Sequence, residues 1–334
     1  MGRYPLRTTL REWIDAMKDY YAPSTLAYTT SILKVIEREF SIAKKGNPDL
    51  KGEPANWGEN EVKAVILAIR RSDLSHNSQV QYLTALRGLL RFVGNGTMDK
   101  MKARYPTMFP RTETERKPSL TEDQLSLVLR ATDQVEGWRG ECMRFAFWTY
   151  AYTGIRLSEL TLAEESDLDT QAWTLRVSHP KGERNYGMHR VLPIPEPLRP
   201  IVSRFLRERE KELARLGMLQ AKPLMFPKGD PSKAVSKNTV QLWKSEVSKI
   251  SGTSFTVHSL RRTYGQNLLN RGVQLPTVSL MLGHSSTITT EKHYCRKDPD
   301  SARLEVIQAF AESRTVPSVN PPMIDRKESL PGYV

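Results

Sequence analysis

The segment from Val257 to Arg296, VHSLRRTYGQNLLNRGVQLPTVSLMLGHSSTITTEKHYCR, decides which fold and which chemistry this sequence predicts. His258 and Arg261 are three residues apart at the start of an expected helix, so their side chains project toward one side. His284 follows a glycine that ends the next expected helix, and Tyr294 comes ten residues later. The segment therefore supplies two imidazoles, a guanidinium and a phenol from consecutive short elements.

Two further candidate groups lie upstream of this segment. In TGIRLSEL, Arg156 follows Gly154, a residue type that commonly ends helices, so its side chain can point into a cleft. Strand patterns over 172–177 and 190–194 flank a polar stretch with Pro, Gly and basic residues, which predicts a hairpin with a long basic turn. Lys181 lies on that turn.

Together these groups suit an attack on a phosphodiester. Arg156 and Arg261 each offer a planar fork of donors to the non-bridging oxygens, whose charge grows in the transition state. The phenol of Tyr294, with an ordinary pKa near 10, needs a base such as His258 and cationic surroundings to act as a nucleophile. Lys181 is the best-placed donor for the departing sugar oxygen. We therefore expect neither a metal nor any other cofactor.

These residues carry a resemblance to the tyrosine recombinases, also called the phage integrase family, of the minimal two-domain Xer-like or integrase type. TGIRLSEL resembles the first box of the family, HSLRRTYGQNLLNRG the second and LGHSSTITTEKHY the third, while HPKGERNYGMHRVLPIP resembles the hairpin that carries a lysine. The resemblance assigns catalytic roles to Arg156, Lys181, His258, Arg261, His284 and the nucleophile Tyr294. It gives Glu159 a supporting role. The spacing of ten residues between His284 and Tyr294 is nine in many members, but His293 at nine is no phenol.

The resemblance implies a reaction and its partners. The enzyme would cleave double-stranded DNA at specific recombination sites, form a 3′-phosphotyrosine with a free 5′-hydroxyl, and exchange strands through a Holliday junction. It would act as a homo-tetramer on two DNA sites and be a monomer or dimer when free. Neither ATP nor metal is needed, because the phosphotyrosine conserves the bond energy.

Two alternatives remain open at this point. A type IB topoisomerase uses a similar Arg, Lys, His and Tyr set but rejoins the same strand. A catalytically idle relative would bind DNA without cutting it. The amphipathic segment 301–313 could dock on a neighbouring protomer, which favours a recombinase, or it could pack on its own domain.

The pattern of apolar residues predicts a mainly α-helical fold with a small β-hairpin or sheet. Four helices in residues 1–95 resemble the SAM-like core-binding domain of the family, and 96–118 is expected to be a linker. An α+β catalytic domain over 119–314 and a flexible tail over 315–334 follow. The resemblance implies that the two domains form a C-shaped clamp around DNA.

Composition agrees with a DNA partner. The chain has 334 residues with 50 Lys and Arg against 37 Asp and Glu, a net charge of +13, so a polyanionic partner is expected. Its two cysteines are too few for a disulfide framework, and no apolar run approaches the roughly 20 residues that a membrane span needs. We expect no membrane partner and a cytoplasmic, nucleoid-associated protein.

Overall fold

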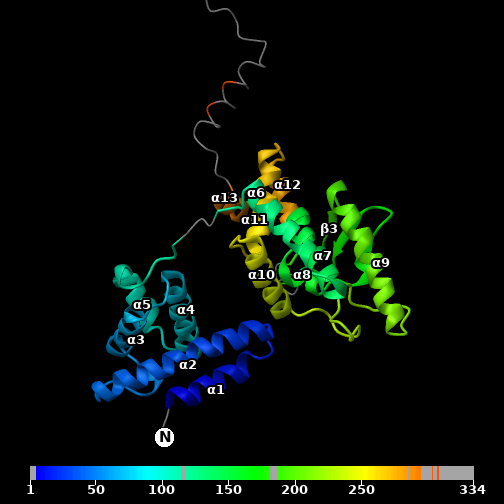
Figure 1. The fold of residues 1–334 in the computed structure, drawn as a ribbon. Helices are drawn as coiled ribbons and strands as arrows, with labels where there is room; N and C mark the ends of the chain where they lie inside the picture. Colours follow the sequence, from blue (N-terminus) through cyan, green and yellow to red (C-terminus); the bar gives the residue numbers. More distant parts are fainter. Residues whose placement is uncertain are drawn as a thin grey trace, which may run out of the picture. The chain divides into compact units, whose positions relative to one another are not determined.

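The computed structural model describes residues 5–113, 118–180, 182, 187–284, 286–294, 303 and 307. The chain divides into two compact units, residues 1–115 and 116–334, and each has its own buried core (Figure 1). Apart from Arg303 and Ile307, the segment 301–313 and the expected tail lie outside the described residues. Among the described residues, no helix combines the length and the hydropathy that a membrane crossing requires.

The first unit is helical, as its apolar periodicity predicts. Its main helices are α1 (Pro5–Met17), α2 (Pro23–Gly46), α3 (Glu59–Arg71), α4 (His76–Phe92) and α5 (Thr97–Arg104), and it has two 3-10 turns, Pro54–Asn56 and Pro106–Met108. Trp13, Ile36, Val65 and Leu86, one from each of the first four helices, are buried in a common core. The four expected helices are therefore present.

The stretch that was expected to be a linker, 96–118, contains structure. Helix α5 buries Met98 and Met101 in the core of the first unit, and Phe109 is buried beside them. Asn95 anchors the start of this stretch, because its side-chain amide donates to the carbonyls of Pro54 and Trp57 at 2.7 and 2.9 Å. An eight-residue helix with only three apolar residues, Met98, Met101 and Ala103, shows too little periodicity to be recognised in the sequence.

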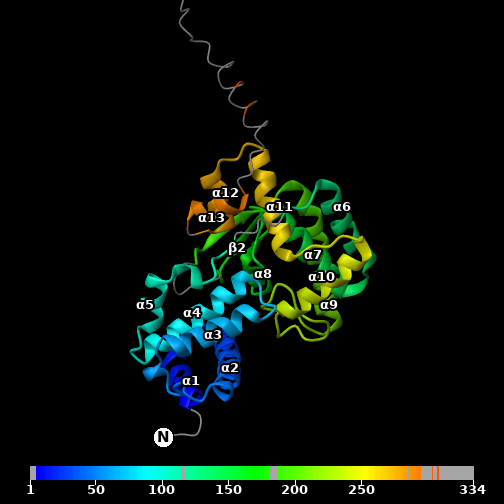
Figure 2. The ribbon, with the colours of Figure 1, turned by 90° about the vertical axis from the view of Figure 1, so that its left-hand side faces the viewer.

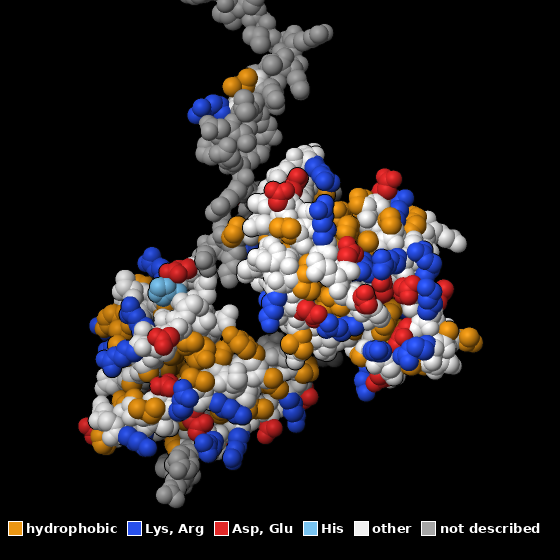
Figure 3. Space-filling view, in the orientation of Figure 1, with side chains coloured by type: hydrophobic (Ala, Val, Ile, Leu, Met, Phe, Trp, Pro, Cys, Tyr) orange, Lys and Arg blue, Asp and Glu red, His pale blue; other side chains and the backbone are white. Residues whose placement is uncertain are grey.

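The basic surplus of the chain is spread over the surface. Figure 3 shows Lys and Arg side chains scattered over the visible face of each unit and interleaved with acidic ones. On this face, charge by itself does not single out one DNA-binding surface, so the site has to be located from its chemistry.

The second unit combines helices with one small sheet. Its helices are α6 (Glu122–Ala131), α7 (Gly137–Thr153), α8 (Leu157–Thr161), α9 (Arg199–Arg215), α10 (Lys237–Ser251), α11 (Val257–Asn270), α12 (Leu275–Leu282) and α13 (Thr287–Tyr294), with 3-10 turns at Thr132–Gln134, Glu165–Asp167 and Glu196–Leu198. The expected capping box of Thr121 and Gln124 opens α6, with both reciprocal hydrogen bonds formed. Figure 2 shows α12 and α13 beside α11.

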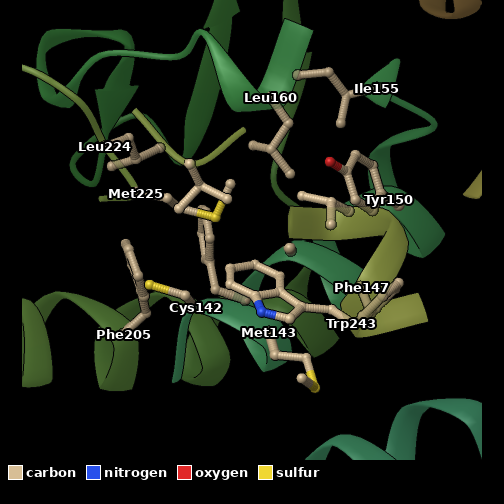
Figure 4. Close-up of a cluster of buried hydrophobic side chains, with 14 of the residues drawn as sticks. Cys142, Met143, Phe147, Tyr150, Ile155, Leu160, Phe205, Leu224, Met225 and Trp243 are labelled. Atoms are coloured by element: carbon tan, nitrogen blue, oxygen red, sulfur yellow. The ribbon is translucent and has the colours of Figure 1, made fainter. Parts of the chain in front are cut away.

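Helix α7 forms the centre of the second unit. Thirteen of its 17 residues are buried, since its apolar residues lie on all sides of the helix rather than along one stripe. It packs against α9 and α11. Figure 4 shows its Cys142, Phe147 and Tyr150 in the same cluster as Phe205 of α9. A helix enclosed in this way gives a rigid support for the residues that follow its end.

The sheet has three antiparallel strands in the order β1 (Leu168–Asp169), β2 (Thr174–Val177) and β3 (Arg190–Pro193). The predicted hairpin is β2 and β3, in which Leu175 pairs with Leu192 and Val177 with Arg190. Burial alternates along both strands, so one face of the sheet lies on the core. Arg190 begins β3 on this buried face.

Candidate active site

The site begins where α7 ends, at Gly154. This residue has φ +63° and donates its backbone N–H to the carbonyl of Tyr150 at 3.2 Å. A Cβ at this position would lie 2.4 Å from Cδ1 of Tyr264. Only glycine tolerates both the left-handed backbone and the close contact. The turn at Gly154 brings the chain directly to Arg156, as the sequence predicts.

Arg156 caps the N-terminus of the short helix α8. Its backbone N–H donates to Oε2 of Glu159 at 3.0 Å, and its Nη1 donates to Oε1 of the same carboxylate at 2.8 Å. Nη2 donates to the carbonyl of Gly283 at 2.5 Å. The Arg156 side chain is still 24% exposed, so a phosphate oxygen can reach its guanidinium.

Glu159 is buried and ionised. Burial by itself would raise the pKa of this carboxyl, but hydrogen bonds and charge from Arg190, together with the backbone N–H and charge of Arg156, outweigh it and lower the pKa to about 2. The carboxylate therefore stays negative at neutral pH and holds both arginines. This geometry supports the predicted supporting role of Glu159.

Arg261 lies on α11, whose first turn is set by a capping box between Thr256 and Ser259. Its guanidinium is buried and donates hydrogen bonds to the backbone carbonyls of Gly154 and Leu282. Gly154 stands two residues before Arg156, and Leu282 stands two residues before the next predicted histidine. Arg261 thus joins the two chain segments that carry Arg156 and His284.

His284 follows the left-handed Gly283 that ends α12, as the sequence predicts. Its backbone N–H donates to the carbonyl of Ser279 at 3.0 Å, and its Nδ1 lies 2.7 Å from the hydroxyl oxygen of Thr290 on α13. Thr290 is fully buried. This contact with a buried hydroxyl fixes the orientation of the imidazole ring.

Helix α13 ends at Tyr294, one helical turn beyond Thr290. The side chain of Tyr294 lies outside the described part of the structure, as does Lys181 on the hairpin turn. His258 is exposed on the first turn of α11, one turn before Arg261. The structure thus brings together Arg156, Glu159, Arg261 and His284, and α13, which ends at Tyr294, packs against α11 and α12.

Two other tyrosines near the site are unsuited to nucleophilic attack. Burial raises the pKa of the Tyr150 phenol. Burial also raises the pKa of Tyr264, although the charges of Arg261 and Arg190 act in the opposite direction. Both phenols remain protonated at neutral pH and are enclosed by protein, which leaves Tyr294 as the better candidate.

Sequence reasoning missed two residues of the site, Arg190 and Thr290. Arg190 donates through Nη2 to Oε2 of Glu159 at 2.7 Å and through Nε to the carbonyl of Met281 at 2.9 Å. An arginine at an inward position of the β3 pattern is the signal that could have revealed it, since a buried charge requires a partner. Thr290 gives no comparable signal, because a threonine on a short helix is ordinary.

The known proteins that this chain resembles share its architecture. Residues 118–300, more than half of the chain, match the model of the Phage integrase family. The tyrosine recombinase XerD of Mycobacterium leprae (strain TN) is 27% identical over 303 residues, which cover 86% of this chain and 92% of that protein. A tyrosine recombinase of Thermosipho africanus (strain TCF52B) is 24% identical over 242 residues, covering 70% of this chain and 79% of that protein.

Solved structures agree with this assignment. The Tn1549 transposon integrase in complex with transposon right end DNA has a TM-score of 0.69 at 17% identity and covers 92% of this chain and 99% of its own. The XerH site-specific recombinase bound to palindromic difH substrate has a TM-score of 0.67 at 18% identity and covers 91% and 84%. The fold is therefore that of a tyrosine recombinase. The chain belongs to the phage integrase family, and its activity is site-specific DNA recombination.

Proposed function

We propose that Tyr294 is the nucleophile with which this chain cleaves DNA, and that Arg156, Arg261 and His284 act on the scissile phosphate. The observation that carries the proposal is the pair of hydrogen bonds from Arg261 to the carbonyls of Gly154 and Leu282. These bonds bring segments that are more than a hundred residues apart in the chain into one site. The buried charge of Arg261 beside the partly exposed guanidinium of Arg156 suits a phosphodiester.

In the cleavage step, the phenol oxygen of Tyr294 bonds to phosphorus and the bond from phosphorus to the 5′-oxygen breaks. The phenol proton passes to a base, for which His258 is our candidate, and the departing 5′-oxygen takes a proton from Lys181. The products are a 3′-phosphotyrosine and a free 5′-hydroxyl. Attack by the 5′-hydroxyl of a partner strand reverses these bond changes and rejoins the DNA.

Arg156, Arg261 and His284 would stabilise the charge that develops on the non-bridging oxygens. In a site from which water is largely excluded, such preorganised donors contribute more than they do in bulk water. Glu159 would hold the guanidinium of Arg156 in place. The arrangement supplies cationic groups from side chains, and on this basis the reaction requires neither a metal ion nor ATP.

Strand exchange needs two DNA sites and several protomers, so we propose a tetramer on DNA that passes through a Holliday junction and a monomer or dimer in its absence. The protein would act on nucleoid DNA in the cytoplasm. The relatives are named recombinases, and this argues against relaxation of supercoils by a topoisomerase as the main activity.

The proposal is tested by trapping the covalent adduct. Wild-type protein is used to select bound duplexes from a pool with a randomised core, and these duplexes are then nicked next to the candidate cleavage position. We expect wild type to form an adduct that survives denaturation, while Tyr294→Phe binds with similar affinity and forms none. Tyr20→Phe, which changes a tyrosine of the first unit that is 81% exposed, is the matched control and should retain the adduct. An adduct of normal yield in Tyr294→Phe contradicts the proposal, and so does its absence in wild type.

A further inference from the structure

Arg190 connects three parts of the second unit. It begins β3, its side chain is 4% exposed, and its guanidinium contacts α8 and the end of α12. Nη1 and Nη2 donate to the two carboxylate oxygens of Glu159 at 3.2 and 2.7 Å, and Nε donates to the carbonyl of Met281 at 2.9 Å. All three guanidinium nitrogens are thus engaged with groups that adjoin expected catalytic residues.

The turn before His284 is shaped around Arg190. A Cβ built on Gly283 would lie 2.7 Å from Nη1 and 2.8 Å from Cζ of Arg190. Gly283 also has φ +63°, so this glycine is required for its backbone and for the contact. Its carbonyl in turn accepts from Arg156. Arg190 therefore packs against the turn that precedes His284. Arg156 donates a hydrogen bond to the same turn.

The charges of these residues form one group. The carboxylate of Glu159 accepts from Arg156 and from Arg190, so two positive charges share one negative charge. If Arg190 were absent, Glu159 would lose one of these two arginines, and its carboxylate would offset more of the charge that Arg156 presents to a phosphate. The interaction would be strong, because the Glu159 side chain has no exposed surface.

We propose that Arg190 is a positioning residue for DNA cleavage: it satisfies Glu159 so that the charge of Arg156 remains available to the phosphate, and it holds the turn that carries His284. The inference rests on the proposed function. Arg190 itself does not touch the reacting atoms. It acts through Glu159 and through the Met281 to Gly283 turn. Strand β3 therefore contributes a residue to the site, in addition to forming the hairpin that carries Lys181.

The test compares single-turnover adduct formation in Arg190→Met, Arg190→Lys and the double variant Arg190→Met with Glu159→Gln. Arg190→Met removes one of the two positive charges that Glu159 pairs with, so we expect cleavage to slow by about tenfold or more, the loss seen when a residue that orients an active-site group is removed. Affinity for the DNA should stay near that of wild type. Arg190→Lys should recover part of the cleavage rate, because its ammonium restores the positive charge but cannot bond both Glu159 and the Met281 carbonyl as the guanidinium does.

The double variant separates the two explanations for a slow Arg190→Met. Glu159→Gln removes the unshared negative charge, so the double variant should cleave faster than Arg190→Met alone. If Arg190 only stabilised the fold, replacing Glu159 as well would not restore cleavage. The cleavage rate of the double variant would then be equal to or lower than that of Arg190→Met. Such a result overturns the inference.

Arg176→Met is the matched control, because Arg176 lies on β2 of the same sheet with a side chain that is 57% exposed. It should cleave at the wild-type rate.

Thermal unfolding of each variant is measured alongside, and a rate loss in Arg190→Met that disappears well below its melting temperature also overturns the inference. Wild type reports on the proposed function in the same assay: if it forms no adduct, the proposed function fails. If it forms one and Arg190→Met matches its rate, only the role of Arg190 fails.

Discussion

The guanidinium of Arg261 donates a hydrogen bond to the backbone carbonyl of Gly154, a residue 107 positions earlier in the chain. The same guanidinium donates to the carbonyl of Leu282. One buried side chain therefore sets the distance between the segment that begins with Arg156 and the turn that carries His284. The geometry of the site depends on this connection.

Replacement of Gly154 by alanine should destabilise the second unit. The residue has φ +63° and its Cβ would overlap Tyr264, so we expect a loss of about 2–5 kcal/mol in the free energy of unfolding, from backbone strain and overpacking together. Gly252→Ala is the control, since Gly252 has φ +66° at the end of α10 with no atom within 4 Å of a built Cβ. It should lose only about 1–2 kcal/mol. Equal losses in urea unfolding would show that the contact with Tyr264 is unimportant.

Arg156→Lys should impair cleavage much more than DNA binding. Lysine cannot bond Glu159, the Gly283 carbonyl and a phosphate through one planar group. We expect a loss of roughly 10²–10³ in the single-turnover rate, as for removal of a donor to a developing anion. Arg271→Lys, at the exposed end of α11, serves as the control and should keep the wild-type rate. A normal rate for Arg156→Lys would remove Arg156 from the site.

Stability should depend on pH through Glu159. Its pKa is lowered from 4.5 to about 2 in the folded protein, so the ionised carboxylate contributes stability that is fully present above about pH 4.5. That contribution, about 3 kcal/mol for a pKa lowered by this much, should be lost as pH falls from 4.5 through 2. Glu159→Gln should therefore be less stable at pH 7, with a difference from wild type that shrinks below pH 4.5. The prediction is wrong if the two proteins differ by the same free energy of urea unfolding at pH 7 and at pH 2.5.

Thr290→Val tests the orientation of His284. Valine preserves the volume but removes the hydroxyl that lies 2.7 Å from Nδ1 of the imidazole. Cleavage should slow by about tenfold, while the free energy of unfolding should change by about 1 kcal/mol, the usual net value of one hydrogen bond. Thr287→Val, at the exposed first position of α13, should leave the rate unchanged. If both variants cleave at the same rate, Thr290 does not orient the ring.

Cleavage should be insensitive to chelators. Arg156 and Arg261 bring positive charge to the site through side chains, so adduct formation in excess EDTA is expected to match that in its absence. DNA binding, by contrast, should weaken steeply with salt, with the logarithm of the binding constant falling by about 0.9 per phosphate contact for each logarithmic unit of salt. Inhibition by EDTA that added Mg²⁺ reverses would contradict the proposed chemistry.

Much of the fold follows from local patterns. The apolar periodicity located helices α1 to α4, because each presents one stripe of apolar residues to a core. Gly154 and Gly283 marked helix ends, because few other residues adopt the left-handed conformation that they have. Helices α5, α8 and α13 were missed, since eight residues or fewer carry too little periodicity.

By itself, the sequence determined the family, the order of the boxes and the identity of Arg156, Glu159, Arg261 and His284 as site candidates, because those residues stand in short local motifs. Only the tertiary structure decided that Arg261 bonds two distant carbonyls, that Thr290 holds His284, and that Arg190 shares Glu159 with Arg156. The physical reason is that hydrogen bonds and charge pairing act over a few ångströms in space. Partners in this site lie as many as 127 residues apart in the chain, so no local spacing in the sequence predicts the contact.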